Sequence, residues 1–405
     1  MGDIEDNVKV LFISGSLGLG HIGRDLEIAK ALRKGHPEID LYWLAEDPAT
    51  IVLKEAGEKL LPEAESLAHG NSELDSSAKD YNANLLKWAM NMRKGWSGNA
   101  ALVAKVIERE RFDLVVGDEA YDIIIEMTKD PSFKKFRFVM MFDFIGGDAI
   151  THHPMDLLGT YMFNRIWVKA LTAEPPIADR SIFLGEIDDV PDRKFGFMLP
   201  NRRRLAEKYL DFVGYVLSFD PKGYEEKSKV RQPLGYGGEP LIVCSIGGTA
   251  AGGALLDLCA KAYPIVKKEI PEVKMVLVCG PRLLADSISA TEGIEVKGYV
   301  PELYKHLAAA DLCIVTGGGT ITLELTALQR PFLYFPLEQH FEQEIDVAMR
   351  CERHRAGIKM MYSKTTPEAL AKAVISNIGK KVSYAPIPTD GAQKAAKLIY
   401  DALEK

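Results

Sequence analysis

Short, nearly continuous apolar runs recur along the chain and alternate with longer amphipathic stretches. In the first half, these runs are residues 8–14, 39–45, 112–117 and 136–142. Apolar runs of this length are typical of strands that are buried on both faces of a parallel sheet. The stretch at residues 22–34 has helical spacing, with Leu26, Ala29 and Leu32 on one face. The pattern therefore predicts a doubly wound α/β domain.

The same alternation begins again in the second half, after a change in composition. Residues 218–239 interleave prolines and glycines with charged residues, which is typical of a linker between domains. The strand-like runs that follow are residues 241–246, 274–279, 294–300, 312–315 and 331–335. We therefore predict a domain at 1–219, a linker at 220–238, a second domain at 239–385 and a C-terminal helical segment at 386–405.

Two stretches near the end of the first half add to this prediction. Residues 212–217 are apolar and are predicted to form the last strand of the first domain. Residues 161–171 predict an amphipathic helix rich in aromatic side chains. We favour the interpretation that this helix faces the core. The alternative is that it lines an apolar acceptor site or contacts the edge of a membrane.

Composition narrows the class of protein. The chain has 405 residues, 47% hydrophobic and 26% charged, with a net charge of −7. These values are typical of a soluble globular protein and do not favour nucleic acid as a partner. The five cysteines lack zinc-ligand spacing, the N-terminus lacks a hydrophobic signal region, and no apolar run is long enough to span a membrane. We therefore predict a cytoplasmic protein without a transmembrane segment.

Three consecutive glycines, Gly317–Gly319, follow one apolar run and precede a helix predicted to begin near Thr320. Such a turn presents free backbone N–H groups and the positive end of a helix dipole, which favours a phosphate. Glu324 lies one helical turn further along, where it can accept hydrogen bonds from ribose hydroxyls. Glu342 and Gln343 follow the next strand and can reach a sugar. An ordinary βαβ turn followed by solvated charges is the alternative.

This stretch resembles the donor-binding signature of GT-B glycosyltransferases. The similarity is greatest to the family of the peptidoglycan GlcNAc transferase, and plant and animal UDP-glycosyltransferases are more distant. The residues that carry it are Gly317, Gly318, Gly319, Thr320, Glu324, Glu342 and Gln343. In these families the glycine turn holds the diphosphate, the helix Glu holds the ribose, and the acidic–Gln pair holds the sugar. Thr316 stands where plant enzymes have His, so their acceptor classes do not carry over.

The resemblance implies an α/β GT-B fold of two Rossmann-like doubly wound domains facing a central cleft. It also implies that the last helix packs back onto the first domain. A second loop, Gly247–Gly253, resembles the family's other phosphate loop, with Gly248 and Thr249 at the donor diphosphate. Val300 matches the position where relatives contact the nucleobase edge, and Arg282 is a further candidate for charge neutralisation.

Gly18, Gly20 and Gly23 follow the first strand and match the GxGxxG fingerprint of dinucleotide-binding proteins. Because Gly15 already begins the turn, the loop is about three residues too long for that fingerprint. The resemblance to GT-B enzymes instead implies that His21 is the general base for the acceptor, with Gly18 and Gly20 on the acceptor side. Histidine suits this task because its ordinary pKa is near 6.5.

Acidic residues end two neighbouring strands of the first domain. Asp118 follows the run at 112–117, and plant relatives place an Asp there that orients the base His. Glu119 and Asp143 are adjacent candidates, and Asp143 is placed on the acceptor side. The alternative for Asp118 is an acid that only terminates the strand.

No metal site is predicted, because no DxD set lies in a suitable loop. His152 and His153 are adjacent, and neighbouring residues of a strand point to opposite faces. No cofactor is predicted beyond the donor substrate itself.

The sequence therefore predicts a metal-independent, inverting hexosyl- or N-acetylhexosaminyltransferase. Its donor would be a nucleoside-diphosphate sugar, such as UDP-GlcNAc or a UDP-hexose, and its acceptor a small or lipid-linked hydroxyl compound. Peripheral membrane contact is left open. The alternatives are a hydrolysing UDP-GlcNAc 2-epimerase and a non-catalytic nucleotide-sugar-binding subunit.

Overall fold

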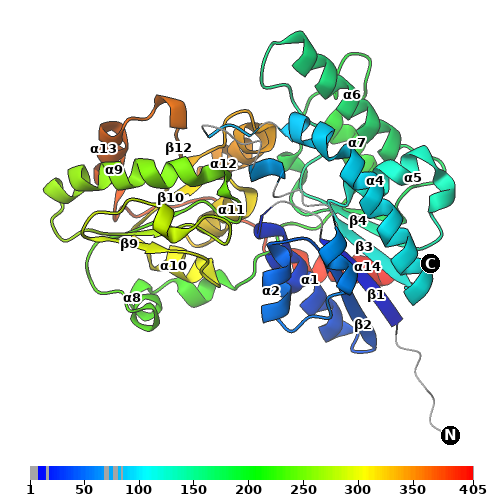
Figure 1. Ribbon diagram of the computed structural model, residues 1–405, viewed down its shortest axis with the longest axis horizontal. Coiled ribbons are helices and arrows are strands. Elements are labelled where there is room, and N and C mark those ends of the chain that lie inside the picture. Colours follow the sequence, from blue (N-terminus) through cyan, green and yellow to red (C-terminus); the bar gives the residue numbers. More distant parts are fainter. Residues whose placement is uncertain (1–7, 15–17, 68–72, 76–80, 84, 405) are drawn as a thin grey trace, which may run out of the picture. The chain divides into compact units, whose positions relative to one another are not determined.

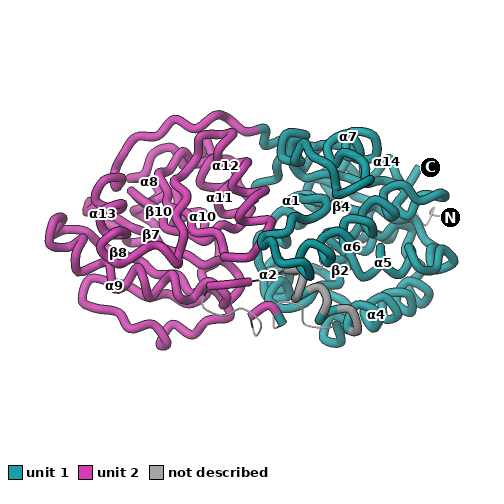
Figure 2. The backbone as a smooth tube through the Cα atoms, turned by 90° about the horizontal axis from the view of Figure 1, so that it is seen from above, with its two compact units in different colours: residues 1–73, 86–218, 388–405 teal, residues 74–85, 219–387 magenta. Residues whose placement is uncertain are grey.

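The computed structural model describes residues 8–14, 18–67, 73–75, 81–83 and 85–404 (Figure 1). The chain divides into two compact units, coloured in Figure 2. Unit 1 comprises residues 1–73, 86–218 and 388–405, and unit 2 comprises residues 74–85 and 219–387. The N-terminal residues 1–7 and the loop residues Gly15–Leu17 lie outside the described part of the chain.

A six-stranded parallel sheet forms the centre of unit 1. Its order is β2-β1-β3-β4-β5-β6. The strands are β1 (Val8–Ser14), β2 (Ile39–Ala45), β3 (Leu114–Asp118), β4 (Phe138–Phe142), β5 (Arg180–Phe183) and β6 (Asp211–Phe212). The residues of β3 and β4 are all buried, because helices cover both faces of the sheet. The strand order reverses between β1 and β3, and open α/β sheets bind ligands at the carboxyl ends of strands at such a switch point.

The helices of unit 1 come from three separate parts of the chain. They are α1 (Gly20–Gly35), α2 (Ala49–Glu55), α4 (Leu85–Glu110), α5 (Tyr121–Lys129), α6 (Pro154–Leu171), α7 (Arg202–Tyr209) and α14 (Gly391–Asp401). The last helix, α14, packs against α1, and its residues Ala395 and Ile399 belong to the same hydrophobic core as the strands (Figure 1). The C-terminal segment is therefore an integral part of unit 1.

Unit 2 contains a second six-stranded parallel sheet. Its order, β12-β11-β10-β7-β8-β9, is that of the dinucleotide-binding Rossmann fold. The strands are β7 (Leu241–Ser245), β8 (Lys274–Val278), β9 (Ile294–Lys297), β10 (Leu312–Thr316), β11 (Phe332–Phe335) and β12 (Ile358–Lys359). The switch point of this sheet lies between β7 and β10.

Helices cover both faces of the second sheet. They are α8 (Lys227–Arg231), α9 (Gly253–Glu269), α10 (Leu303–Ala309), α11 (Gly319–Ala327), α12 (Ala348–His354) and α13 (Pro367–Asn377). Figure 1 shows α9 and α13 on one side of the sheet and α8 and α10 on the other. A π-helical segment, η8 (Glu342–Val347), precedes α12.

Three segments differ from the pattern-based predictions. The strand predicted at 212–217 ends at Phe212, because Gly214 has a φ of +79° and Tyr215 bonds instead to the carbonyl of Pro388. The segment predicted as a linker contains α8, whose Arg231 is buried and bonds to Asp311 within unit 2. Residues 74–85, although they lie early in the chain, are grouped with unit 2.

The apolar face of α6 shows the largest difference between the predicted and the observed burial of side chains. Trp167 is buried, but five large apolar side chains of this helix are exposed: Met155, Leu157, Leu158, Met162 and Ile166. The favoured interpretation of a core-facing helix, made for residues 161–171, is therefore wrong for Met162 and Ile166. None of the described helices has the combination of length and apolar character that a membrane span requires.

Candidate functional site

The first cluster of interest lies at the switch point of unit 1. His21 is the second residue of α1, directly after the loop that leaves β1, and Asp118 is the last residue of β3. The two strands are paired with Ser14 beside Asp118, so the start of α1 and the end of β3 meet at one edge. His21 Nδ1 lies 2.9 Å from Asp118 Oδ2. The structure thus brings together the two residues that the sequence predicted as base and orienting acid.

Arg24 joins these two residues and was not predicted. Its guanidinium donates to both Asp118 oxygens, at 2.8 and 3.0 Å, and to Asp143 Oδ2 at 2.8 Å. Arg24 is only 8% exposed, so these charges lie in a largely dehydrated environment. The sequence feature that could have pointed to Arg24 is its position three residues after His21, which places both residues on one face of α1.

The Nδ1 atom of His21 faces both an acceptor and a donor. Besides Asp118, it lies 2.5 Å from Arg24 Nη2. With its proton on Nδ1, the ring donates to Asp118 and leaves Nε2 as the basic atom. With its proton on Nε2, the ring instead accepts from Arg24. Only the first tautomer leaves a basic nitrogen, Nε2, that does not already accept from Arg24, and Asp118 is the group that favours this tautomer.

The pKa values of the carboxyl groups in this cluster are shifted in opposite directions. Burial opposes the ionisation of Asp118 and Asp143, but Arg24 and His21 outweigh it and hold the pKa of both below its ordinary range. Burial, together with the charge on Asp143, raises the pKa of Glu119 well above its ordinary value. Burial and the charge on Asp118 do the same for Asp25. The two carboxyl groups that contact the Arg24 guanidinium are therefore the ones favoured in the ionised form.

Glu119 and Asp143 approach the other side of the His21 ring. Glu119 Oε2 lies 3.9 Å and Asp143 Oδ2 lies 3.8 Å from Nε2. Glu119 has a φ of +51°, a conformation that non-glycine residues seldom adopt and that occurs preferentially at functional sites. His21, Glu119 and Asp143 have the residue types of a metal site and lie within 4.8 Å of one another. Arg24 already supplies the positive charge beside Asp143.

The loop before His21 is described only in part. Gly18 has a φ of +84°, which would be strained for a residue with a side chain, and Gly20 is the first residue of α1.

His152 and His153 are exposed in the loop before α6, where the His153 ring accepts a hydrogen bond from the Met155 N–H. Neither belongs to this cluster.

The second cluster lies at the switch point of unit 2, where two glycine loops leave adjacent strands. Ser245, at the end of β7, is paired with Val315 near the end of β10. Gly252, in the first loop, also lies against Thr316, the last residue of β10 before the second loop, since a Cβ atom added to Gly252 would lie 2.7 Å from Thr316 Cγ2. The two predicted phosphate loops therefore lie side by side.

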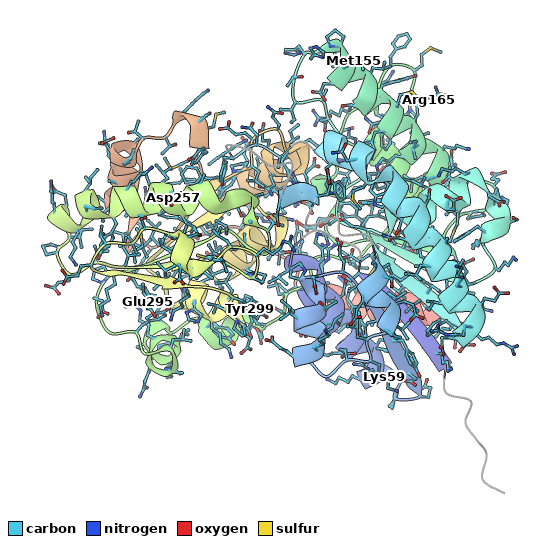
Figure 3. The ribbon with its side chains drawn as sticks, in the orientation of Figure 1. Lys59, Met155, Arg165, Asp257, Glu295 and Tyr299 are labelled. Atoms are coloured by element: carbon cyan, nitrogen blue, oxygen red, sulfur yellow. The ribbon has the colours of Figure 1, made fainter. Side chains whose placement is uncertain are left out.

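The first loop is tightly packed against its neighbours. Gly248 is buried, and Thr249 precedes the short 3₁₀ helix Ala250–Gly252 without capping it through its side chain. A Cβ atom added to Gly280, after β8, would lie 2.2 Å from Gly247 O. Gly280 N in turn donates to Gly298 O, which connects this loop with the half-buried Tyr299 and Val300 after β9 (Figure 3).

The second loop begins α11. Gly317 is packed so closely on Pro336 that an added Cβ atom would lie 2.7 Å from Pro336 Cα. Gly318 is the N-cap residue of α11, and Gly319 and Thr320 form its first turn, half-buried. The N–H groups of this turn have no partner within the helix, and N–H groups at the start of a helix can donate hydrogen bonds to an anion.

Glu324 projects from the next turn of α11. Burial raises the pKa of its carboxyl group to about 8. The carboxyl group has no hydrogen-bond partner among the described residues. A ribose that donates hydroxyl hydrogen bonds would supply the missing partners.

Glu342 and Gln343 begin the π-helical segment after β11 and have different surroundings. Glu342 is half-buried, and its Oε1 lies 3.6 Å from the position of a Cβ atom added to Gly319, so it lies at the start of α11. The side-chain oxygen of Gln343 accepts a hydrogen bond from Leu337 N at 2.9 Å, which holds the loop. Single turns of π-helix occur frequently at functional sites.

Part of the chain matches a family of known proteins. Residues 242–401 match the family model "Glycosyltransferase family 28 C-terminal domain". The chain is 27% identical over 194 residues to the UDP-N-acetylglucosamine–N-acetylmuramyl-(pentapeptide) pyrophosphoryl-undecaprenol N-acetylglucosamine transferase of Clostridioides difficile, covering 44% of this chain and 46% of that protein. It spans about half the length of the curated relatives it matches. The resemblance to family 28 is confirmed.

Solved structures resemble nearly the whole chain. The glycosyltransferase SnogD from Streptomyces nogalater matches with a TM-score of 0.57 and 16% identity, over 98% of this chain and 100% of that one. The UDP-GlcNAc 2-epimerase of Methanocaldococcus jannaschii matches with a TM-score of 0.60 and 13% identity, over 97% and 100%. Sequence identities this low show a shared fold and nothing further. The predicted α/β two-domain GT-B fold is confirmed.

Proposed function

We propose that this chain, a family 28-like glycosyltransferase of the GT-B fold, transfers a sugar from a nucleoside-diphosphate sugar to an acceptor hydroxyl with inversion. The observation that carries the proposal is the pair of glycine loops at the switch point of unit 2. They leave β7 and β10 side by side, within the part of the chain that matches the family 28 C-terminal domain. Two anion-binding turns next to each other suit a diphosphate.

In the proposed reaction, His21 acts as the general base. The acceptor hydroxyl gives its proton to Nε2 while its oxygen attacks the anomeric carbon of the donor. The bond from that carbon to the phosphate oxygen breaks, and its electron pair leaves with the nucleoside diphosphate. Because attack comes from the side opposite the leaving group, one displacement inverts the anomeric configuration.

The charge of the unit 1 cluster supports this role. With Asp118 and Asp143 ionised and Arg24 protonated, the cluster carries one more negative than positive charge. A proton taken up by His21 balances it. Asp118, hydrogen-bonded to Nδ1, then stabilises the imidazolium and keeps Nε2 turned toward the acceptor.

Unit 2 is proposed to bind the donor. The amides of Gly248, Thr249, Gly318, Gly319 and Thr320 would hold the diphosphate and stabilise the charge that develops on it. Glu324 would accept hydrogen bonds from the ribose, and Glu342 would orient the sugar. Val300 would contact the nucleobase through its backbone. A UDP-sugar is the donor that we favour, since the family 28 relative from Clostridioides difficile is named for UDP-N-acetylglucosamine.

The acceptor is proposed to be apolar or lipid-linked. The five apolar side chains of α6 are between 43% and 67% exposed, and Met155 lies at the outer end of that helix (Figure 3). An exposed apolar surface of this kind is typical of an interaction site. It suits a lipid chain or the surface of a membrane.

Replacing His21 tests the proposed base. His21→Ala is expected to lower kcat roughly 10²- to 10⁴-fold, the usual contribution of general base catalysis, and to leave the Kd of the donor unchanged. His152→Ala, which removes an exposed histidine of the same unit, is the matched control and should retain full activity. Unchanged transfer by His21→Ala would contradict the assignment. Release of free sugar and UDP without any acceptor would indicate a hydrolysing epimerase instead.

A further inference from the structure

An acidic side chain from early in the sequence occupies the first glycine loop of unit 2. Asp75 Oδ1 accepts a hydrogen bond from the backbone N–H of Ala250 at 2.8 Å. Its other oxygen, Oδ2, forms an ion pair with Arg282 Nε. The Asp75 side chain is 14% exposed, so the contact is largely shielded from water. Asp75 and Ala250 are 175 residues apart in the sequence, and no local turn explains their contact.

The two donors that hold Asp75 are the kind that hold a phosphate. Ala250 begins the 3₁₀ turn that leads into α9, a helix of 17 residues, so its N–H group lies near the positive end of that helix. Arg282 follows Gly280 at the end of β8, the glycine that packs on Gly247. A backbone amide and a guanidinium together form charge-assisted hydrogen bonds to anionic oxygens of carboxylates and phosphates alike.

Residues 81–83, the next described residues after Asp75, make contacts of their own within unit 2. The Tyr81 side chain is 2% exposed, donates a hydrogen bond to Phe335 O at 2.8 Å, and stacks on Tyr362 with ring centroids 4.5 Å apart. Ala83 N donates to Glu338 O at 2.9 Å, and Glu338 N donates to Tyr81 O at 3.0 Å. These contacts hold residues 81–83 at the loop after β11, at the same edge of the sheet as the glycine loops.

We infer that Asp75 is an intramolecular competitor for the donor diphosphate, so that donor binding requires its carboxylate to leave Ala250 and Arg282. The inference rests on the proposed function and adds a regulatory contact to the donor site. A phosphate oxygen and the Asp75 carboxylate cannot share these two donors, and like charges held close together repel each other. The Asp75-occupied form therefore lowers the fraction of molecules that are ready to bind the donor.

Removing the charge at position 75 tests the inference. If nine molecules in ten hold the contact, the apparent Kd is about tenfold above the intrinsic one. Asp75→Asn is then expected to bind UDP and inorganic pyrophosphate about tenfold more tightly than the unaltered protein, measured by isothermal titration calorimetry. Asp75→Glu keeps the charge and should bind no more tightly than the unaltered protein. Asp257→Asn is the matched control, because it removes an exposed carboxylate of unit 2 on α9 (Figure 3), and its affinity should not change.

A double variant locates the effect. In an Arg282→Gln background, where one partner of the ion pair is gone, the gain from Asp75→Asn should shrink to less than about twofold. Unchanged or weaker binding by Asp75→Asn overturns the inference and makes Asp75 a residue that positions Arg282 for the donor. If neither the unaltered protein nor Asp75→Asn binds UDP or pyrophosphate, the proposed function fails as well.

Discussion

At the scale of single residues, Glu324 is the side chain whose proposed contact with the ribose would couple its protonation most directly to nucleotide binding. Its raised pKa, about 8, means that the ligand-free carboxyl group is mostly protonated at neutral pH. Hydroxyl groups that donate hydrogen bonds to it stabilise the ionised form and lower that pKa. Binding of a ribose would therefore release a proton, and affinity would depend on pH.

Donor affinity is expected to rise with pH in a way that depends on Glu324. Between pH 6 and 8, the Kd of UDP-GlcNAc should fall by up to about tenfold per pH unit. At higher pH the Glu324 carboxyl group is already ionised, so ligand binding no longer has to remove its proton. Glu324→Gln should bind more weakly at pH 8 and lose the pH dependence. Titrations in two buffers of different ionisation enthalpy measure the proton release. Equal dependence on pH in both proteins would contradict the ribose assignment.

The same carboxyl group makes stability depend on pH without ligand. Its pKa in the folded chain lies above the ordinary value of 4.5. Its contribution to stability is therefore fully present below about pH 4.5 and is lost as the pH rises through about 8. Glu324→Gln should flatten the fall in Tm over this window.

Sequence reasoning named those candidate site residues whose type and spacing carry information by themselves. His21 and Asp118 each follow an apolar strand, and parallel strands bring such positions to one edge. Arg24 was missed because a basic residue within an amphipathic helix is usually solvent-exposed, and only the tertiary contact with Asp118 and Asp143 shows otherwise. The hydrogen bond of Gln343 to Leu337 was missed for the same reason.

At the scale of elements, α6 is the helix whose observed exposure differs most from the burial that its hydrophobic pattern predicts. The spacing correctly indicates a helix, but spacing does not reveal what covers an apolar face. Leu158 and Met162 lie four residues apart on this helix, are 55% and 50% exposed, and form part of the exposed apolar surface.

Charges placed on α6 should separate folding from acceptor or membrane binding. The double variant Leu158→Glu with Met162→Glu is expected to keep the Tm within a few degrees, because exposed positions contribute little to the core. It should weaken binding to vesicles that contain anionic lipid by at least about tenfold. Ala101→Glu, at an exposed position of α4, is the control. Equal vesicle binding by all three proteins, measured by sedimentation, would contradict a lipid-facing role.

At the scale of the whole molecule, the chain forms two units, each of which is built from segments that are not contiguous in the sequence. The last helix belongs to unit 1, and residues 74–85 belong to unit 2. Most of the strands could be predicted, since continuous apolar runs are local signals. The placement of Asp75 and Tyr81 could not, because it depends on contacts with residues far along the chain.

A cavity in α14 should destabilise unit 1 selectively. Ile399 is fully buried in the core of that unit, so Ile399→Ala is expected to cost about 2–5 kcal/mol there. Leu370→Ala, in the fully buried face of α13, is the matched change in unit 2. In calorimetry with UDP present, only the unit 2 transition should shift upward with ligand. An Ile399→Ala variant that lowers the UDP-stabilised transition instead would contradict this division.

The central claim is that the two glycine loops of unit 2 hold a nucleoside diphosphate, and its most direct measurement is a thermal-unfolding screen of nucleotides. At a ligand concentration of 100 times Kd, binding adds about 2.7 kcal/mol to stability, which is readily visible as a higher Tm. We expect UDP to raise the Tm and Gly319→Asp, which adds a negative charge at the start of α11, to abolish that rise. A protein whose Tm is indifferent to every nucleoside diphosphate would contradict the account.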